Sequence, residues 1–277
     1  MSFELLSPSL GKQISQFLNA RDDTGAITLV FANSAYEQVL DNWLRYAGRF
    51  VNSNLLIFAL DVPLYDILSA RGLPVILLPY DGTNEALWLE RLKVFHFFCS
   101  MGIDFVHSDA DAIWLREPLS YCFSINADLV ISQGTIWPPD VAENWGFVLC
   151  CGFFAVRASA RMASFFNNVM KVATEVLDDQ VALNRTLRAA GISWTSDGIA
   201  SDEMTVNGLS FHCFNNVVFG NAPSLGIRVA MLPHNDFQRL PRHSSTAYIK
   251  HLLTPKDAIL KIATLREHGC WIDGDQY

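Results

Sequence analysis

Short apolar runs alternate with helix-like segments within the first 110 residues of this 277-residue chain. The apolar runs lie at residues 27–32, 55–60, 75–78 and 105–106. Apolar residues at helical spacing lie between them, over residues 35–46, 64–70 and 85–101. Continuously apolar strands are typical of a parallel sheet covered on both faces, and helical crossovers connect such strands. We therefore predict an α/β fold with a Rossmann-like, mostly parallel sheet and helices on both faces.

The second half of the chain shows a less regular pattern. Strands are predicted at residues 129–132 and 151–157, and helices at residues 160–176, 179–189 and 255–268. Residues 137–146, rich in aromatic residues and proline, are predicted to form a loop, and residues 192–229 to be irregular with short strands. Because no linker, repeat or low-complexity tract interrupts the pattern, we predict a single domain over residues 1–277.

Composition limits the classes of function. Hydrophobic residues make up 51% of the chain and charged residues 17%, which favours a compact globular protein. No uninterrupted run of about 18 apolar residues occurs, so no transmembrane segment is predicted. The formal net charge of −8, without a block of basic residues, argues against nucleic acid as a partner.

The cysteines and the first residues bear on the compartment. The six cysteines lack CxxC pairs and zinc-site spacing, and most lie in apolar segments, so they are predicted to be reduced, buried thiols. Residues 1–6 lack the basic region and long apolar core of a signal peptide. We therefore expect a cytoplasmic protein.

Asp109 and Asp111 follow the fourth apolar run. Side chains alternate along an extended backbone, so the two carboxylates point the same way and repel each other unless a cation lies between them. Oxygen ligands suit Mg²⁺ or Mn²⁺, which bind phosphate. For the tripeptide alone, an acidic turn that caps the next helix is the better explanation. Its position at the carboxyl end of a sheet strand, where open α/β sheets bind ligands, favours a metal–diphosphate site for a nucleotide-sugar.

Three segments, in this order, resemble the nucleotide-diphospho-sugar transferase domain of glycosyltransferase family 77: Asp104–Pro118, Cys151–Arg157 and Asp178–Asn184. Residues 27–43 and 251–271 look like the opening and closing segments of that domain. The resemblance implies a GT-A fold, a UDP-sugar donor, Mn²⁺ (or Mg²⁺) and transfer with retention of anomeric configuration. It divides the chain into a nucleotide-binding half, about residues 25–120, and an acceptor-binding and closing half, about residues 121–277. Cys150-Cys151 stands where the family usually has Asn-Thr.

The resemblance also implies roles for individual residues. Asp111 would ligate the metal, Asp109 would bind the metal or the donor ribose, and His251 would be the third ligand, although its spacing alone fits a surface histidine.

Three further residues are donor-binding candidates. They are Asn33, which otherwise fits a helix cap, Lys93, which otherwise fits a solvent-facing lysine, and Lys256, near a helix start that presents N–H groups to anions. Lys261 fits either a phosphate contact or a solvated helix face.

Asp178, Asp179 and Gln180 are the catalytic candidates. Acidic residues at the positive end of a helix need no function, so capping is the simpler explanation. The resemblance implies that Asp179 and Gln180 reach the sugar or the acceptor hydroxyl, and a carboxylate there could stabilise an oxocarbenium-like centre. Whether it attacks as a nucleophile or only positions groups stays open. Aromatic residues that could stack on sugars are Trp137 and Trp145, whereas Phe153 is expected in the core.

Together these features predict a metal-dependent glycosyltransferase, either hexosyl- or pentosyltransferase. It would move sugar from a UDP-sugar to a hydroxyl of a glycan, lipid-linked or protein acceptor. A phosphate hydrolase is disfavoured, because such enzymes place the carboxylate pair directly after the first strand. The alternative from another class is a non-catalytic nucleotide-sugar-binding module of degenerate GT-A fold.

Overall fold

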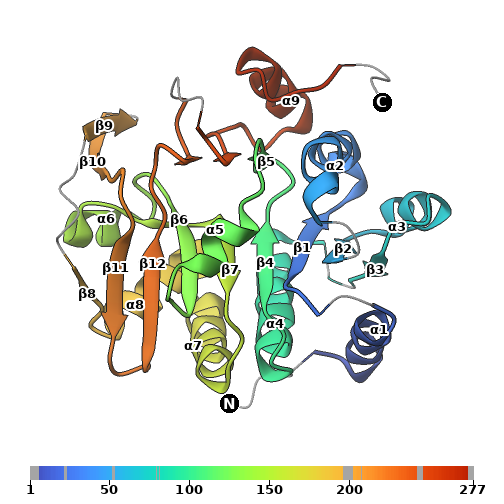
Figure 1. Ribbon diagram of the computed structural model, residues 1–277, viewed down its shortest axis with the longest axis horizontal. Helices are drawn as coiled ribbons and strands as arrows, with labels where there is room; N and C mark the ends of the chain where they lie inside the picture. The colour runs from blue at the N-terminus through green and yellow to red at the C-terminus, as the bar shows by residue number, and fades with distance from the viewer. Residues whose placement is uncertain are drawn as a thin grey trace.

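A nine-stranded sheet forms the centre of the molecule, in the order β3-β2-β1-β4-β7-β6-β12-β11-β8 (Figure 1). The computed structural model describes residues 6–21, 24–51, 54–78, 80, 82–195, 202–206, 208–241 and 246–273. The strands of this sheet are β1 (Ile27–Ala32), β2 (Leu55–Ala59), β3 (Val75–Leu77), β4 (Phe105–Ser108), β6 (Leu129–Gln133), β7 (Leu149–Val156), β8 (Ser193–Trp194), β11 (Val218–Ala222) and β12 (Ile227–Met231). Only β7 and β11 run against the other strands of the described sheet, which confirms the predicted mostly parallel architecture.

Successive residues of the strands enter two separate cores. On β1, Leu29 and Phe31 belong to one hydrophobic cluster, and Val30 and Ala32 belong to the other. The first cluster is completed by α1 (Pro8–Asn19), α4 (Asn84–Ser100), α7 (Ala160–Val176) and α8 (Asp179–Ala189). The second is completed by α2 (Glu37–Val51), α3 (Val62–Ala70), α5 (Leu119–Ser124) and α9 (Ala258–Glu267). Helices therefore cover both faces of the sheet, as its continuously apolar strands predict (Figure 1).

A small second sheet joins distant parts of the chain. It has the order β13-β14-β5, formed by β13 (Phe237–Gln238), β14 (Ile249–Lys250) and β5 (Ile113–Trp114). In the antiparallel pair, Lys250 lies opposite Ile113. Because His251 directly follows β14 and Asp111 lies two residues before β5, this pairing brings the histidine to the carboxylates.

Three helices, α3, α4 and α8, start at capping side chains. Asp61 accepts a hydrogen bond from the Leu64 N–H at the start of α3, and Thr83 caps α4 in the same manner. Asp178 accepts from the Val181 N–H at the start of α8. Such caps satisfy amide groups that the helix itself leaves free, so the sequence fixes where each helix begins.

Several elements differ from the sequence-based prediction. The helices at residues 160–176 and 179–189 have the predicted bounds, but the predicted loop at residues 137–146 contains α6 (Pro139–Trp145). Its proline occupies the first turn, where the missing N–H costs nothing, and Gly146 ends the helix at φ 79°. Helix α1, whose capping residue is Ser7, was also not predicted.

The predicted helix over residues 35–46 begins as a 3₁₀ turn, η1 (Ser34–Tyr36), and continues as α2 to Val51. The segment predicted to be irregular with short strands does contain short strands, which pair as regular ladders and include the hairpin of β9 (Asp202–Val206) and β10 (Leu209–Cys213).

Among the described residues, no helix has the length and apolar character needed to cross a bilayer. Residues 1–5, part of the segment on which the signal-peptide prediction rests, lie outside the described residues.

Candidate active site

A cavity of about 560 Å³ opens where β1, β2 and β4 end. Its walls also include the first turns of α4, the first residues of β7, the start of α8 and residues 239–261. Ligands of open α/β sheets bind at this edge, beyond the carboxyl ends of parallel strands. All but one of the predicted site residues line the cavity; they are Asn33, Asp109, Asp111, Asp178, Asp179, Gln180, His251 and Lys256.

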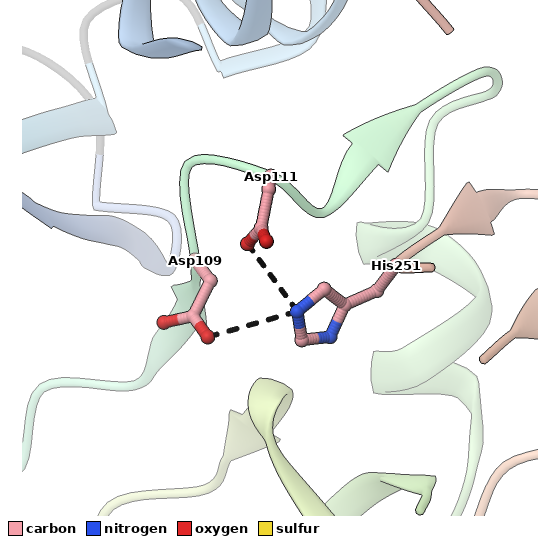
Figure 2. A group of neighbouring side chains, drawn as sticks. All are labelled: Asp109, Asp111 and His251. Atoms are coloured by element: carbon pink, nitrogen blue, oxygen red, sulfur yellow. Dashed lines mark ion pairs between the residues drawn. The ribbon is translucent and has the colours of Figure 1, made fainter. Parts of the chain in front are cut away.

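Asp109, Asp111 and His251 converge on one point of the cavity (Figure 2). The His251 Nε2 atom lies 3.3 Å from Asp111 Oδ1 and 3.8 Å from Asp109 Oδ2. One ligand atom from each residue lies within 4.8 Å of the others. Two carboxylates and one imidazole suit Mn²⁺ or Mg²⁺, and three protein ligands leave positions for phosphate oxygens. The residues present therefore fit a divalent cation.

The loop that carries the carboxylates is anchored beneath them. The Ser108 hydroxyl accepts hydrogen bonds from the indole N–H groups of Trp43 and Trp114, each over 3.1 Å. The Asp109 N–H donates to the Gly152 carbonyl over 2.8 Å. These bonds fix the end of β4 and so fix the direction in which the two carboxylates leave it.

Gly152 on β7 forms the floor of this site. A Cβ atom built there would lie 1.9 Å from His251 Cε1 and 2.8 Å from Asp109 Oδ2. No side chain fits at these distances, so the absence of a Cβ lets the imidazole and the carboxylate pack directly on the backbone.

Arg91 on α4 is the principal site residue that the sequence analysis missed. Its guanidinium is buried, with Nη1 3.0 Å from Asp109 Oδ1 and Nη2 bonded to Asp179. Burial opposes the charge, but the nearby carboxylates of Asp179 and Asp109 raise the pKa of Arg91. Burial likewise opposes the charge of Asp109, yet the His107 hydrogen bond and Arg91 hold its pKa below the usual range.

The prediction that Lys93 faces the donor is corrected by this geometry. Lys93 Nζ lies 2.6 Å from Glu90 Oε1, and Lys93 does not line the cavity. The cavity face of α4 carries Asn84, Leu87, Trp88 and Arg91, which follow helical spacing. Lys93 lies two residues beyond Arg91, roughly 200° around the helix, and this periodicity was the signal that could have identified Arg91.

Lys261 on α9 is buried against Asp111. Its ammonium bonds Asp111 Oδ2 and lies 2.6 Å from Thr254 Oγ1, so the solvated-face explanation is wrong. The two oxygens of Asp111 are thereby divided, with Oδ2 held by Lys261 and Oδ1 turned toward His251. Burial opposes the charge of Asp111, but His251 and Lys261 hold its pKa well below the usual range. Burial and Arg239 oppose the charge of His251, but Asp111 and Cys150 raise its pKa to about 9.

The three catalytic candidates at the start of α8 have distinct contacts. Asp178 caps the helix, as the simpler explanation predicts, and burial raises the pKa of its carboxyl group. Asp179 is buried and paired with Arg91. Gln180 accepts from the Cys151 N–H over 3.3 Å and donates to the Trp137 carbonyl over 2.7 Å.

Asn33 and Lys256 lie on the side of the cavity toward α2. Asn33 makes no capping hydrogen bond, and its Oδ1 atom is buried without a partner among the described residues. An unsatisfied buried oxygen is costly unless a ligand supplies a donor. The carbonyl of the exposed Lys256 accepts a hydrogen bond from the Tyr36 hydroxyl.

The exposure of the aromatic residues and cysteines can be compared with the predictions made for them. Phe153 is fully buried, as expected. Trp145 packs on Phe147 and Trp194, with ring centroids 5.9 and 5.3 Å away. Trp137 is 55% exposed beside the start of α8. All six cysteines are free and buried.

Comparison with known proteins identifies the class. The nucleotide-diphospho-sugar transferase family profile matches residues 51–262, which is more than half of the chain. The chain therefore belongs to the nucleotide-diphospho-sugar transferase family. Together with the mostly parallel sheet, this membership confirms the predicted glycosyltransferase class and its GT-A fold.

Two curated relatives come from Arabidopsis thaliana. The beta-arabinofuranosyltransferase RAY1 is 24% identical over 218 residues, which cover 72% of this chain and 41% of the relative. The arabinosyltransferase XEG113 is 21% identical over 197 residues, which cover 64% of this chain and 30% of the relative. The chain thus spans less than half the length of either relative.

Solved structures with some likeness include the WbbM bifunctional glycosyltransferase, with a TM-score of 0.43 at 12% identity over 59% of this chain and 37% of that one. GlyE of Streptococcus pneumoniae has a TM-score of 0.41 at 16% identity over 59% and 43%.

Proposed function

We propose that this domain transfers a pentosyl group of the arabinosyl class from a UDP-sugar to a hydroxyl of a glycan acceptor, with a divalent cation bound by Asp109, Asp111 and His251. The observation that carries the proposal is the convergence of these three side chains in the cavity at the sheet edge. The names of the two plant relatives support the choice of arabinose over a hexose.

The residues around the cation would each bind a different part of the donor. Mn²⁺ or Mg²⁺, when bound, would neutralise the charge that develops on the leaving diphosphate. Asn33, at the end of the first strand, presents to the nucleoside an amide oxygen that has no partner in the described part of the chain. Lys256 adds a positive charge at the cavity wall for phosphate. Because Lys261 holds one oxygen of Asp111, the other stays available to the cation.

Asp179 stabilises positive charge at the anomeric carbon in this proposal, and the reaction proceeds with retention. Its Oδ2 atom is engaged by Arg91, which orients the carboxylate and lowers its reactivity as a nucleophile. We therefore assign Asp179 an electrostatic role, with the acceptor approaching on the face that the diphosphate leaves. The Gln180 side-chain oxygen accepts from Cys151 and its nitrogen donates to Trp137, and these two hydrogen bonds order the loop at the acceptor side.

Hydrolysis of a donor panel tests this function without knowledge of the acceptor. Purified protein with Mn²⁺ would be incubated with UDP-arabinofuranose, UDP-arabinopyranose, UDP-xylose, UDP-glucose and UDP-galactose, and released sugar measured by NMR. We expect release of arabinose with retained configuration and much slower release of hexose. Nucleotide-sugar binding without any release would instead support the non-catalytic module, and preferred release of a hexose would contradict the assigned donor.

A further inference from the structure

His251 has little conformational freedom apart from rotation of its ring. Its backbone N–H donates to the Gln238 carbonyl over 2.8 Å, and its own carbonyl accepts from Arg239 Nη1 over 2.7 Å. The ring rests on Gly152, where no Cβ separates it from the backbone. Only 6% of the His251 surface is exposed, so bulk solvent has little access to its second nitrogen. Another protein group must decide which nitrogen faces the carboxylates.

That group is the thiol of Cys150. Its Sγ atom lies 3.7 Å from His251 Nδ1, on the side of the ring away from the carboxylates. Cys150 is 2% exposed, and the Gly152 N–H also hydrogen-bonds its sulfur. A sulfur that receives one N–H and faces a ring nitrogen has capacity to accept a second hydrogen bond, from the Nδ1–H of His251.

An irregularity in β7 aims the sulfur at this point. Phe154 lies opposite Ile131 of β6, but the next residue of β6, Ser132, lies opposite Cys150, so β7 advances four residues for one on β6. Bulges of this kind bend a strand and re-aim its side chains near functional sites. A regular antiparallel register would place Phe153 opposite Ser132, so the bulge is what brings Cys150 to this position.

We propose that Cys150 is a positioning residue for the metal ligand His251: its sulfur accepts the Nδ1–H and thereby keeps Nε2 directed at Asp109 and Asp111. The inference rests on the metal site of the proposed function. A neutral imidazole has one N–H, and a partner for that N–H leaves the lone pair of the other nitrogen for a cation. The cysteine thus supplies, at this position, the outer contact that orients a ligating histidine.

Removal of the acceptor tests the inference through metal binding. Mn²⁺ affinity would be measured by calorimetry for the unaltered protein, Cys150→Ala, Cys150→Ser and the control Cys99→Ala, which removes a buried thiol from α4 outside the cavity. We expect Cys150→Ala to bind Mn²⁺ about 10–100-fold more weakly. Cys150→Ser, which keeps an acceptor, should recover most of the affinity, and Cys99→Ala should bind as the unaltered protein does.

A spectroscopic readout separates orientation from general destabilisation. Electron spin echo modulation of bound Mn²⁺ detects a coordinated imidazole nitrogen, which Cys150→Ala should weaken and Cys150→Ser should retain. Equal affinity and equal nitrogen modulation in Cys150→Ala and the unaltered protein would overturn the positioning role while leaving the metal site intact. Failure of the unaltered protein to bind Mn²⁺ would overturn both the role and the proposed function.

Discussion

The two walls of the cavity differ in how the chain builds them. The sheet-edge wall consists of the ends of β1, β2 and β4 together with α4. The three strands are neighbours in the sheet, and all of these residues lie within the first 111 positions. The closing wall consists of β7, the start of α8 and residues 239–261, and its last part reaches the carboxylates through the pairing of β14 with β5. One wall follows from local sequence, whereas the other depends on long-range contacts.

The walls also depend on each other electrostatically. The sheet-edge wall contributes Asp111, and the closing wall contributes Lys261 and His251, which bury that carboxylate between them. Arg91 reaches in the opposite direction, to Asp179 of the closing wall. A buried charge without a partner is costly, so docking of the walls stabilises both. The candidate metal site therefore also joins the two walls.

The largest effect is expected where both walls meet, at Asp111. Asp111→Asn keeps the shape but removes the charge that the cation and Lys261 share, so turnover should fall by about 10³-fold or more. The rate of donor hydrolysis in the presence of Mn²⁺ measures this loss of turnover. The control is Asp41→Asn, which removes a carboxylate that pairs with Arg71 outside the cavity. Activity within a few-fold of the unaltered protein in Asp111→Asn would contradict the assigned role.

Arg91 and Lys93 differ by two positions and should differ widely in their effect on stability. Arg91→Met leaves Asp109 and Asp179 without their buried partner, and the free energy of unfolding should fall by about 3–5 kcal/mol. Lys93→Met removes only an i,i+3 pair with Glu90, worth about 0.3–0.5 kcal/mol. Urea unfolding measures both changes. Similar losses in the two variants would show that Arg91 does not join the walls.

Gly152 tests the floor shared by the two walls. Gly152→Ala places a Cβ against the His251 ring and the Asp109 carboxylate, so Mn²⁺ should bind at least about tenfold more weakly and stability should fall by about 1–3 kcal/mol. Gly48→Ala is a matched control in α2, where the new Cβ meets nothing within 4 Å and helix propensity should stabilise by up to about 1 kcal/mol. Thermal unfolding with and without Mn²⁺ distinguishes them; unchanged metal binding in Gly152→Ala would argue against this packing.

The smallest effect should be confined to the sheet-edge wall. Asp61 caps α3 and accepts from the Ser34 N–H and hydroxyl; although burial opposes its charge, these bonds lower its pKa in the folded protein. Their contribution is therefore present above the unfolded pKa, about 3.9, and is lost as pH falls through the lower folded value. Asp61→Ala, which removes every acceptor oxygen, should cost about 1 kcal/mol at pH 7 and progressively less below pH 4. A pH-independent difference in urea unfolding would contradict this origin.

Much of the sheet-edge wall could be predicted because its signals are local. The apolar runs of β1 to β4 are bounded by clear breaks, and Asp109 and Asp111 share one extended segment. Arg91 was not predicted because a charged residue on an apolar helix face does not fit the hydrophobic pattern. Its burial is explained only by its two carboxylate partners, which lie far away in the sequence. Helix α6 was not predicted because prolines favour a loop unless they lie in the first turn of a helix, as they do here.

The closing wall could be predicted only in part. The resemblance pointed to His251, but neither its burial nor its contact with Asp111 follows from nearby sequence, since both require β14 to pair with β5. The bulge in β7 that aims Cys150 depends on unequal spacing against β6, which no periodicity in β7 alone reveals. Lys261 fitted either a phosphate contact or a solvated helix face, and its ion pair was not foreseen because the partner lies 150 positions earlier in the chain.

Calorimetric titration of UDP, with Mn²⁺ and then with a chelator, tests the central claim most directly. If the two walls form a metal–diphosphate site, UDP should bind with Mn²⁺ and lose most of its affinity when the metal is removed. Equal affinity for UDP in the presence of chelator, or no binding under either condition, would contradict the account and leave Asp109 and Asp111 as a purely structural pair.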